Sequence, residues 1–213
     1  MPLIKNHFVY RADELLLIET KKKEGFTHQD WSLEYFMPLR SRIRDFYRKE
    51  QKGNCAYCMQ PISIQAAANA QVEHILPKSK HETFIFEVKN LCVICADCNQ
   101  AKGAKNALNG EEIDTVQSKP RQYPSSSNRF LIIHPAIDTY SEHIAIKGKL
   151  YIDLTSKGHF TIGACNLNRF THKFGIEQSM LDDYGIFQLL ERYSTGGAQE
   201  KQCVFEKIRE LRG

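Results

Sequence analysis

Two cysteine pairs with the same internal spacing constrain this chain of 213 residues more than any other feature. Cys55 and Cys58 form one C-x-x-C pair, and Cys95 and Cys98 form a second pair after 36 intervening residues. A two-residue gap lets one tight turn present two sulfur atoms to the same ion, and four thiolates complete the tetrahedral shell of zinc. We therefore predict a structural Zn²⁺ site that joins two distant segments and contributes directly to folding.

Two other interpretations of the cysteines compete with zinc, namely a redox C-x-x-C motif and a set of buried free thiols. Neither explains two pairs at matched spacing. Cys92 adds an ambiguity because it forms a further C-x-x-C with Cys95. If residues 91–94 form a strand, we expect Cys92 to be a core residue. We expect Cys165 and Cys203 to be core residues as well.

The rest of the sequence favours a globular protein that acts in the cytoplasm. Hydrophobic residues make up 42% of the chain, but no run of 18 apolar residues predicts a membrane-spanning helix. The first residues lack the basic and apolar regions of a secretory signal. We therefore expect a cytoplasmic protein without a membrane partner, in which clustered cysteines favour metal over disulfides.

A second set of polar residues lies between and just after the cysteine pairs. In order, it consists of Glu73-His74-Ile-Leu-Pro-Lys-Ser, Asn90-Leu91 and Cys98-Asn99-Gln-Ala-Lys102-Gly103. This order, over about residues 53–106, resembles the zinc-containing branch of the HNH endonucleases. The resemblance implies an α+β chain in which a mainly helical surround carries a ββα-metal (HNH) module stapled by a four-cysteine zinc site.

The same resemblance implies a role for each matching residue. His74 corresponds to the general base, and Asn90 to the asparagine that holds the loop and orients this histidine. Asn99 corresponds to a ligand of a catalytic divalent cation, Mg²⁺ or Mn²⁺. Glu73 corresponds to an acidic position that often contributes to the same cation. Many relatives have aspartate there, so direct ligation by the longer Glu73 side chain stays open.

The chemistry of these residue types agrees with the implied roles. Hydrolysis of a phosphodiester needs an activated water molecule and neutralisation of charge on the phosphate and the leaving oxygen. A histidine with an ordinary pKa near ~6.5 can accept a proton at neutral pH. A hard cation accepts oxygen ligands from a carboxylate and an amide and keeps open positions for phosphate and water.

The charge distribution indicates where nucleic acid could bind. The chain carries a net charge of +4, and the stretch from Arg40 to Lys52 alone accounts for it, with six basic and two acidic residues. A positive stripe suits contact with a phosphate backbone, although charge alone is explained more commonly by a solvated helix face. The residues expected to contact nucleic acid are Arg40, Arg44, Arg48 and Lys102. For Lys102, simple solvent exposure stays open.

Hydrophobic periodicity predicts the elements around the module. Apolar residues at steps of three and four predict a helix over 31–52, which Pro38 could divide into two short helices. Alternating apolar and polar residues predict short strands at 150–152 and 160–162. Residues 165–212 are expected to be helical.

Composition and the HNH resemblance together predict that the chain is divided into four stretches. Residues 1–52 form an N-terminal arm and basic helix, and 53–106 form the HNH nuclease module with its zinc knuckles. Residues 107–129 are polar and rich in proline and serine, so we predict a linker. Residues 130–213 form a C-terminal α+β region that could bind a partner.

The C-terminal stretch resembles a defence-associated subgroup, the bacterial HNH proteins of the Septu and related retron systems. The matching residues are Arg129–Asp138, His143-Ile144, Lys157–Ile162 and Leu167–Arg169. This resemblance implies anti-phage defence and an ABC-type ATPase partner. His134 and His143 are expected to be packing or surface residues, and His81 a surface residue.

The leading functional interpretation is therefore an endonuclease that cuts DNA or, alternatively, RNA. A non-catalytic zinc module that binds nucleic acid or protein is the second interpretation. The twin C-x-x-C pairs fit both. Glu73, His74, Asn90 and Asn99 favour the enzyme, because a bare zinc module has no need of them.

Overall fold

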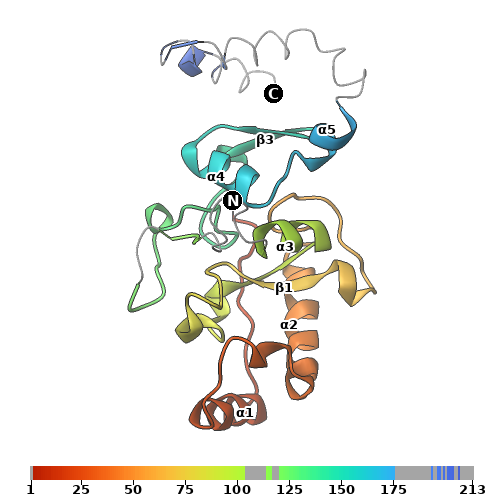
Figure 1. Cartoon of the computed structure of the whole chain (residues 1–213), viewed down its shortest axis with the longest axis vertical. Coiled ribbons are helices and arrows are strands. Elements are labelled where there is room, and N and C mark those ends of the chain that lie inside the picture. Colours follow the sequence, from red (N-terminus) through yellow and green to blue (C-terminus); the bar gives the residue numbers. More distant parts are fainter. Residues whose placement is uncertain are drawn as a thin grey trace.

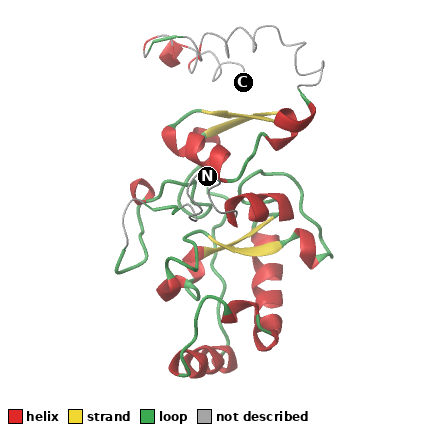
Figure 2. Cartoon of the chain, in the orientation of Figure 1, coloured by secondary structure: helices red, strands yellow, loops and turns green. Residues whose placement is uncertain are grey.

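The computed structural model describes residues 2–103, 114–116 and 120–175, together with 193, 196–197, 199, 201–203 and 206. Helices predominate in these residues, and the strands pair into two small antiparallel sheets (Figure 2). The α-helices and strands are α1 (Ala12–Lys23), α2 (Met37–Glu50), β1 (Gln71–His74), β2 (Leu91–Ile94), α3 (Ala96–Gly103), β3 (Ile144–Lys147), β4 (Leu150–Asp153), α4 (Ser156–Ala164) and α5 (Arg169–Phe174). The predicted α+β class with a mainly helical surround is confirmed.

Short 3₁₀ turns connect several of these elements. They are η1 (Asp30–Ser32), η2 (Glu34–Phe36), η3 (Ala67–Asn69), η4 (Glu82–Phe84), η5 (Val88–Asn90), η6 (Ser127–Arg129) and η7 (Tyr140–Glu142). Figure 1 shows α1 at one end of the long axis, β1 and α3 in the middle, and β3 and α5 further along. No helix among the described residues has the length and apolar character that crossing a membrane requires.

An ion pair joins the two N-terminal α-helices, and α2 turns an apolar face to the core. Glu14 accepts a hydrogen bond from the backbone N–H of Arg11 (2.8 Å), which closes the first turn of α1, and its carboxylate pairs with Arg42 of α2. The buried face of α2 carries residues spaced four apart, Leu39, Ile43 and Tyr47. This spacing places them on one side of the helix, so α2 turns a continuous apolar stripe to the core.

Pro38 lies in the first turn of α2 and does not divide a helix. Proline is tolerated in this position because the first N–H groups of a helix have no intrahelical acceptor. The residues before it form η1 and η2, so the helix predicted over 31–52 begins at Met37 and ends at Glu50.

The centre of the molecule is a ββα unit. Strand β1 pairs antiparallel with β2, with Glu73 opposite Cys92 and His74 opposite Leu91. Every residue of β2 is buried, and α3 begins two residues after β2 and packs on β1, while α2 packs on both strands. The burial expected for Cys92 depended on a strand at residues 91–94. This strand is β2, and Cys92 is fully buried.

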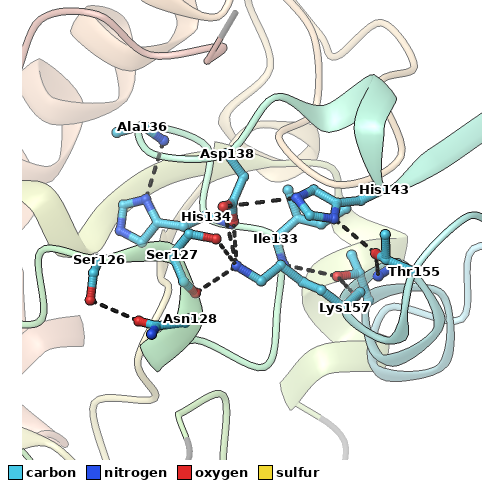
Figure 3. A network of polar contacts seen from close by, with 12 residues as sticks. Ser126, Ser127, Asn128, Ile133, His134, Ala136, Asp138, His143, Thr155 and Lys157 are labelled. Carbon is cyan, nitrogen blue, oxygen red and sulfur yellow. Dashed lines mark hydrogen bonds and ion pairs between the residues drawn. The ribbon is translucent and has the colours of Figure 1, made fainter.

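A buried polar network fixes the segment after residue 125 to α4 (Figure 3). The ammonium of Lys157 donates to the backbone oxygen of Ser127 (2.6 Å) and to both carboxylate oxygens of Asp138 (3.1 and 2.9 Å). Asp138 also accepts a hydrogen bond from the backbone N–H of His134 (2.7 Å). Because Lys157 is paired with a carboxylate, the network acts as a structural clamp, and His134 is a packing residue as expected.

The strand predicted at 150–152 is confirmed as β4, but the strand predicted at 160–162 is wrong, because these residues lie in α4. Thr155 accepts a hydrogen bond from the N–H of Gly158 (3.1 Å) and caps this helix. A Cβ atom at Gly158 would lie 2.0 Å from the carbonyl oxygen of His143. The cap and this close approach outweigh the alternating pattern of the sequence.

The described part of the predicted linker, 107–129, makes specific contacts with the module. Asp114 pairs with His81 (2.9 Å), and the Thr115 hydroxyl donates to the backbone oxygen of Ile75 (2.6 Å). His81 is buried, so the expectation of a surface histidine is wrong: a carboxylate 33 positions later compensates its burial. The predicted domain boundaries stay predictions.

Most of the helix predicted over 165–212 lies outside the described residues, apart from α5 and a few isolated positions. Cys165 is buried, as expected, whereas Cys203 is exposed. The expectation for Cys203 is therefore wrong. A lone cysteine carries no periodicity from which burial could be inferred.

Candidate active site

The four cysteines of the two C-x-x-C pairs come together in one buried cluster. Their sulfur atoms all lie within 4.8 Å of one another, and all four cysteines are free of disulfide bonds. The sulfur atoms of Cys58 and Cys95 are 3.7 Å apart. Zn–S bonds of about 2.3 Å in a tetrahedron require sulfur–sulfur distances of about 3.8 Å. The cluster therefore has the donor type, number and spacing of a structural zinc site.

The backbone around the cluster sets this geometry. The N–H of Cys98 points at the sulfur of Cys95 (3.4 Å), which is the turn expected of a zinc knuckle. Gln51 at the end of α2 donates to the carbonyl oxygen of Val93 (2.7 Å) and accepts from its N–H (2.7 Å). The N–H of Ala56 donates to the same carbonyl (3.1 Å). The first knuckle is thus fixed beside β2, from which the second knuckle continues.

Basic and aromatic residues from the C-terminal half surround the cluster. The guanidinium nitrogens of Arg169 lie 3.8 Å from the sulfur of Cys98 and 3.9 Å from that of Cys95. The Tyr151 hydroxyl donates to the backbone oxygen of Cys58 (2.6 Å). Four thiolates around a Zn²⁺ ion would carry a net charge of −2, and the adjacent guanidinium would reduce the cost of burying them.

A separate pocket of about 520 Å³, which none of these cysteines lines, holds the polar residues of the motif. It lies between residues of α2, β1 and α3. Its charged and polar lining consists of Ser32, Arg40, Arg44, Gln71, Glu73, His74, Lys78, Asn99 and Lys102. The structure therefore brings six residues predicted from the sequence into one concave site: Arg40, Arg44, Glu73, His74, Asn99 and Lys102.

His74 ends β1 and is almost fully buried. Its Nε2 lies 3.1 Å from the carbonyl oxygen of Ile85, and its ring meets the ring of Trp31 edge-on at 4.8 Å between centroids. A carbonyl only accepts hydrogen bonds, so this contact requires the proton on Nε2 and leaves the lone pair on Nδ1. Burial lowers the pKa of His74 to about 3, well below the ordinary value assumed from the sequence, so the imidazole is neutral at neutral pH but a weaker base than an exposed histidine.

Asn90 is fully buried and holds the loop beside His74. Its side-chain oxygen accepts from the N–H of Leu76 (2.7 Å), and its amide nitrogen donates to the carbonyl oxygens of Leu76 (3.3 Å) and Phe84 (3.0 Å). The loop held in this way carries Ile85, whose carbonyl contacts His74. The contacts have the form that the sequence resemblance implies for this residue, and its function in catalysis stays a prediction.

Two side-chain contacts join strand β1 to helix α3 at the pocket. The side-chain amide of Asn99 donates to the side-chain oxygen of Gln71, and the ammonium of Lys102 pairs with the Glu73 carboxylate. Burial disfavours the charged form of Lys102, but the Glu73 carboxylate more than compensates, and the pKa of Lys102 is raised. Lys102 is 6% exposed, so simple solvent exposure does not describe it, whereas its contact with phosphate stays a prediction.

Comparison with known proteins assigns the central unit. The family profile of the HNH endonucleases matches residues 55–105, which include both knuckles, β1, β2 and α3. Residues 55–105 are an HNH endonuclease domain. The chain is also 29% identical over 120 residues to the Septu protein PtuB of Bacillus thuringiensis. The match covers 54% of this chain and 37% of that protein, and no solved structure matches the chain.

Two arginines of α2 extend the HNH pocket toward solvent. Arg40 donates to the carbonyl oxygens of Trp31 and Leu33, and it lies one helical turn before Arg44. Neither guanidinium forms an ion pair with a described residue, and burial lowers the pKa of each. Arg48 differs, because it pairs with Asp45 (2.9 Å) and does not line the pocket.

Residues of both the HNH pocket and the cysteine cluster were missed from the sequence, among them Gln71, Trp31 and Arg169. Gln71 lies two positions before Glu73, so the two-residue period of a strand could have placed it on the same face. Trp31 packs edge-on against His74, but the apolar periodicity of residues 31–52 predicted only that it belongs to a helix. Arg169 lies 71 positions after Cys98, and no local pattern predicts that contact.

Proposed function

We propose that this protein is a metal-dependent HNH endonuclease that hydrolyses phosphodiester bonds, with DNA as the preferred substrate. The observation that carries the proposal is the composition of the HNH pocket. One concavity combines a neutral histidine, a carboxylate, a side-chain amide and two guanidinium groups that form no ion pair with a described residue. A bare zinc module that binds nucleic acid or protein has no need of such a set.

The residues of the pocket divide the work as follows. His74 accepts a proton from the attacking water at Nδ1, while its Nε2–H bond to Ile85 fixes the ring. Glu73 and Asn99 offer a carboxylate and an amide oxygen to a hard divalent cation, Mg²⁺ or Mn²⁺. Such a cation, when bound, supplies charge neutralisation at the phosphate and leaving oxygen. Arg40 and Arg44 attract and position the polyanion.

The zinc site acts at a distance in this proposal. Zn²⁺ bound to Cys55, Cys58, Cys95 and Cys98 would fix the start of α3, which carries Asn99, to the first knuckle. Strands β1 and β2 are only four residues long, so the metal stabilises a small unit that strand pairing alone would leave loose. None of the four cysteines lines the pocket.

We propose that the cellular role is anti-phage defence in the cytoplasm, together with an ABC-type ATPase. The likeness to the Septu protein PtuB and the resemblance of residues 129–169 to the Septu group support this role. The ATPase would restrain cleavage until infection. RNA is the alternative substrate.

Cleavage assays with zinc-loaded protein test the proposal. Wild type and His74→Ala are incubated with supercoiled plasmid and with total RNA, with Mg²⁺ or Mn²⁺, alone and after co-purification with the ATPase partner. We expect cleavage by wild type and loss of cleavage in His74→Ala, with zinc content and melting temperature retained. Equal cleavage by both proteins, or none by either in every arm, would contradict the proposal.

A further inference from the structure

Lys102 contacts both Glu73 and His74, on which the proposed chemistry depends. Its ammonium pairs with the carboxylate of Glu73 and donates to the backbone oxygen of His74 (2.9 Å). The side chains of Lys102 and Glu73 are 5% and 13% exposed, so water screens this pair poorly. One side chain of α3 therefore bridges the Glu-His pair of β1 inside the pocket.

The two side chains proposed as oxygen ligands of the cation, Asn99 and Glu73, make different contacts. Asn99 donates through its amide nitrogen to the side-chain oxygen of Gln71, so the side-chain oxygen of Asn99 takes no part in that bond. The Glu73 carboxylate instead faces an ammonium. A divalent cation bound through the same oxygen would lie within a few ångströms of that ammonium, and two positive centres so close repel strongly.

We propose that Lys102 is the exchangeable counter-ion of Glu73: a divalent cation displaces its ammonium from the carboxylate, and a phosphate of the nucleic acid receives it. This inference rests on the proposed function and adds its regulation. Lys102 already lines the pocket that Arg40 and Arg44 open toward the polyanion. Its flexible four-carbon chain allows the ammonium to leave Glu73 without movement of α3.

Coupling between substrate and cation follows from this exchange. Without nucleic acid, cation binding leaves a buried ammonium without a carboxylate, so affinity is low. With nucleic acid bound, the phosphate compensates the displaced ammonium, and cation affinity rises. By linkage, the cation raises the affinity for nucleic acid by the same factor. The protein would thus assemble its complete metal site chiefly on substrate.

Binding of Mn²⁺, followed by electron paramagnetic resonance on zinc-loaded protein, tests the exchange independently of cleavage. Without DNA, we expect Lys102→Met to bind Mn²⁺ about tenfold or more tightly than wild type, because the competing charge is gone. Lys102→Arg keeps the charge and should stay as weak as wild type. Adding Glu73→Gln to Lys102→Met should remove the gain, which identifies the carboxylate as the ligand.

A second arm adds a short DNA duplex in the His74→Ala background, which prevents turnover, with Mn²⁺ binding to the duplex alone subtracted. The duplex should raise Mn²⁺ affinity when Lys102 is present and change it little in Lys102→Met. Equal Mn²⁺ affinities of wild type and Lys102→Met, with zinc retained in both, would overturn the inference. Lys102→Gln gives a second comparison should the methionine variant fail to fold. Cleavage unaffected by His74→Ala would instead sink the proposed function and leave the Mn²⁺ contrast standing.

Discussion

At the scale of single residues, burial keeps two histidines neutral for different purposes. His74 faces the pocket, whereas His134 is part of a closed structural network. The N–H of Ala136 donates to Nδ1 of His134 (3.2 Å), so the neutral ring carries its proton on Nε2, which lies 2.9 Å from the Tyr123 hydroxyl. That hydroxyl donates to the backbone oxygen of Lys89 (3.0 Å). Every polar atom of the His134 ring is thereby satisfied without a positive charge.

This arrangement predicts a pH dependence of stability. Burial lowers the pKa of His134 to about 4, whereas the unfolded chain has the ordinary value of 6.5. Between these values the unfolded state binds a proton that the folded state does not, so acidification favours unfolding. The stability is complete above pH 6.5 and declines toward pH 4, with a loss of about 2 kcal/mol at pH 5 from this group.

Thermal melting of wild type and His134→Gln at pH 7.5 and pH 5.5 checks this prediction. Glutamine does not titrate, so the variant should lose less melting temperature on acidification than wild type does. The thiolates and His74 respond to pH in both proteins and cancel in the comparison. Identical acid-induced shifts in the two proteins would show that His134 does not carry the effect.

At the scale of elements, α4 shows how one glycine permits a close packing contact. Gly158 lies against the carbonyl oxygen of His143, the residue before β3, so helix and hairpin approach each other there. Gly163 lies in the same helix, and a Cβ atom added to it would meet nothing within 4 Å. The two glycines therefore form a matched pair for mutation.

Gly158→Ala should destabilise the protein by about 2 kcal/mol or more, because the new methyl group meets backbone that cannot move aside. Gly163→Ala should stabilise it by up to about 1 kcal/mol through lower backbone entropy of the unfolded chain. Denaturant unfolding of both variants measures these values. Equal effects of the two substitutions would contradict the packing described for α4.

The two zinc knuckles join distant segments through four cysteines, so loss of one ligand should affect the whole unit. Cys58→Ser removes one of four buried sulfur ligands, so we expect loss of zinc and unfolding or aggregation. Cys203→Ser changes an exposed cysteine outside the cluster and should leave both unchanged. Metal analysis and thermal melting provide the readout. If Cys58→Ser kept its metal and its melting temperature, the zinc assignment would be wrong.

At the scale of the whole molecule, the basic stripe of α2 is divided by its surroundings. Arg44 lines the HNH pocket and forms no ion pair with a described residue, whereas Arg48 is paired with Asp45 outside it. The sequence does not distinguish the two, because both belong to the same charge run. Tertiary packing decides which of them lines the pocket.

Salt-dependent DNA binding distinguishes the two arginines. Arg44→Ala should weaken binding and lower the slope of log affinity against log salt by about 1, as expected for one lost phosphate contact. Arg48→Ala should change the slope little. Fluorescence anisotropy with a labelled duplex, in the His74→Ala background, gives both slopes. The reverse order of effects would place the nucleic-acid path elsewhere.

Local spacing predicted the four-cysteine cluster, because each C-x-x-C pair has a short, fixed interval, and the resemblance to the HNH endonucleases implied the ββα unit and the motif residues that line the pocket. Long-range partners were not predictable. The pairing of His81 with Asp114, the approach of Arg169 to the sulfur atoms and the burial of Lys102 against Glu73 depend on how distant segments pack. The helical α4 was missed because its Thr155 cap outweighs an alternating pattern.

In the proposed function, His74 acts in hydrolysis and not in binding. The most direct measurement is the single-turnover rate constant for plasmid cleavage at saturating zinc-loaded protein, where differences in affinity cancel. We predict a rate constant lower by about 100-fold or more in His74→Ala than in wild type, with unchanged DNA affinity. Equal rate constants for the two proteins would contradict this role.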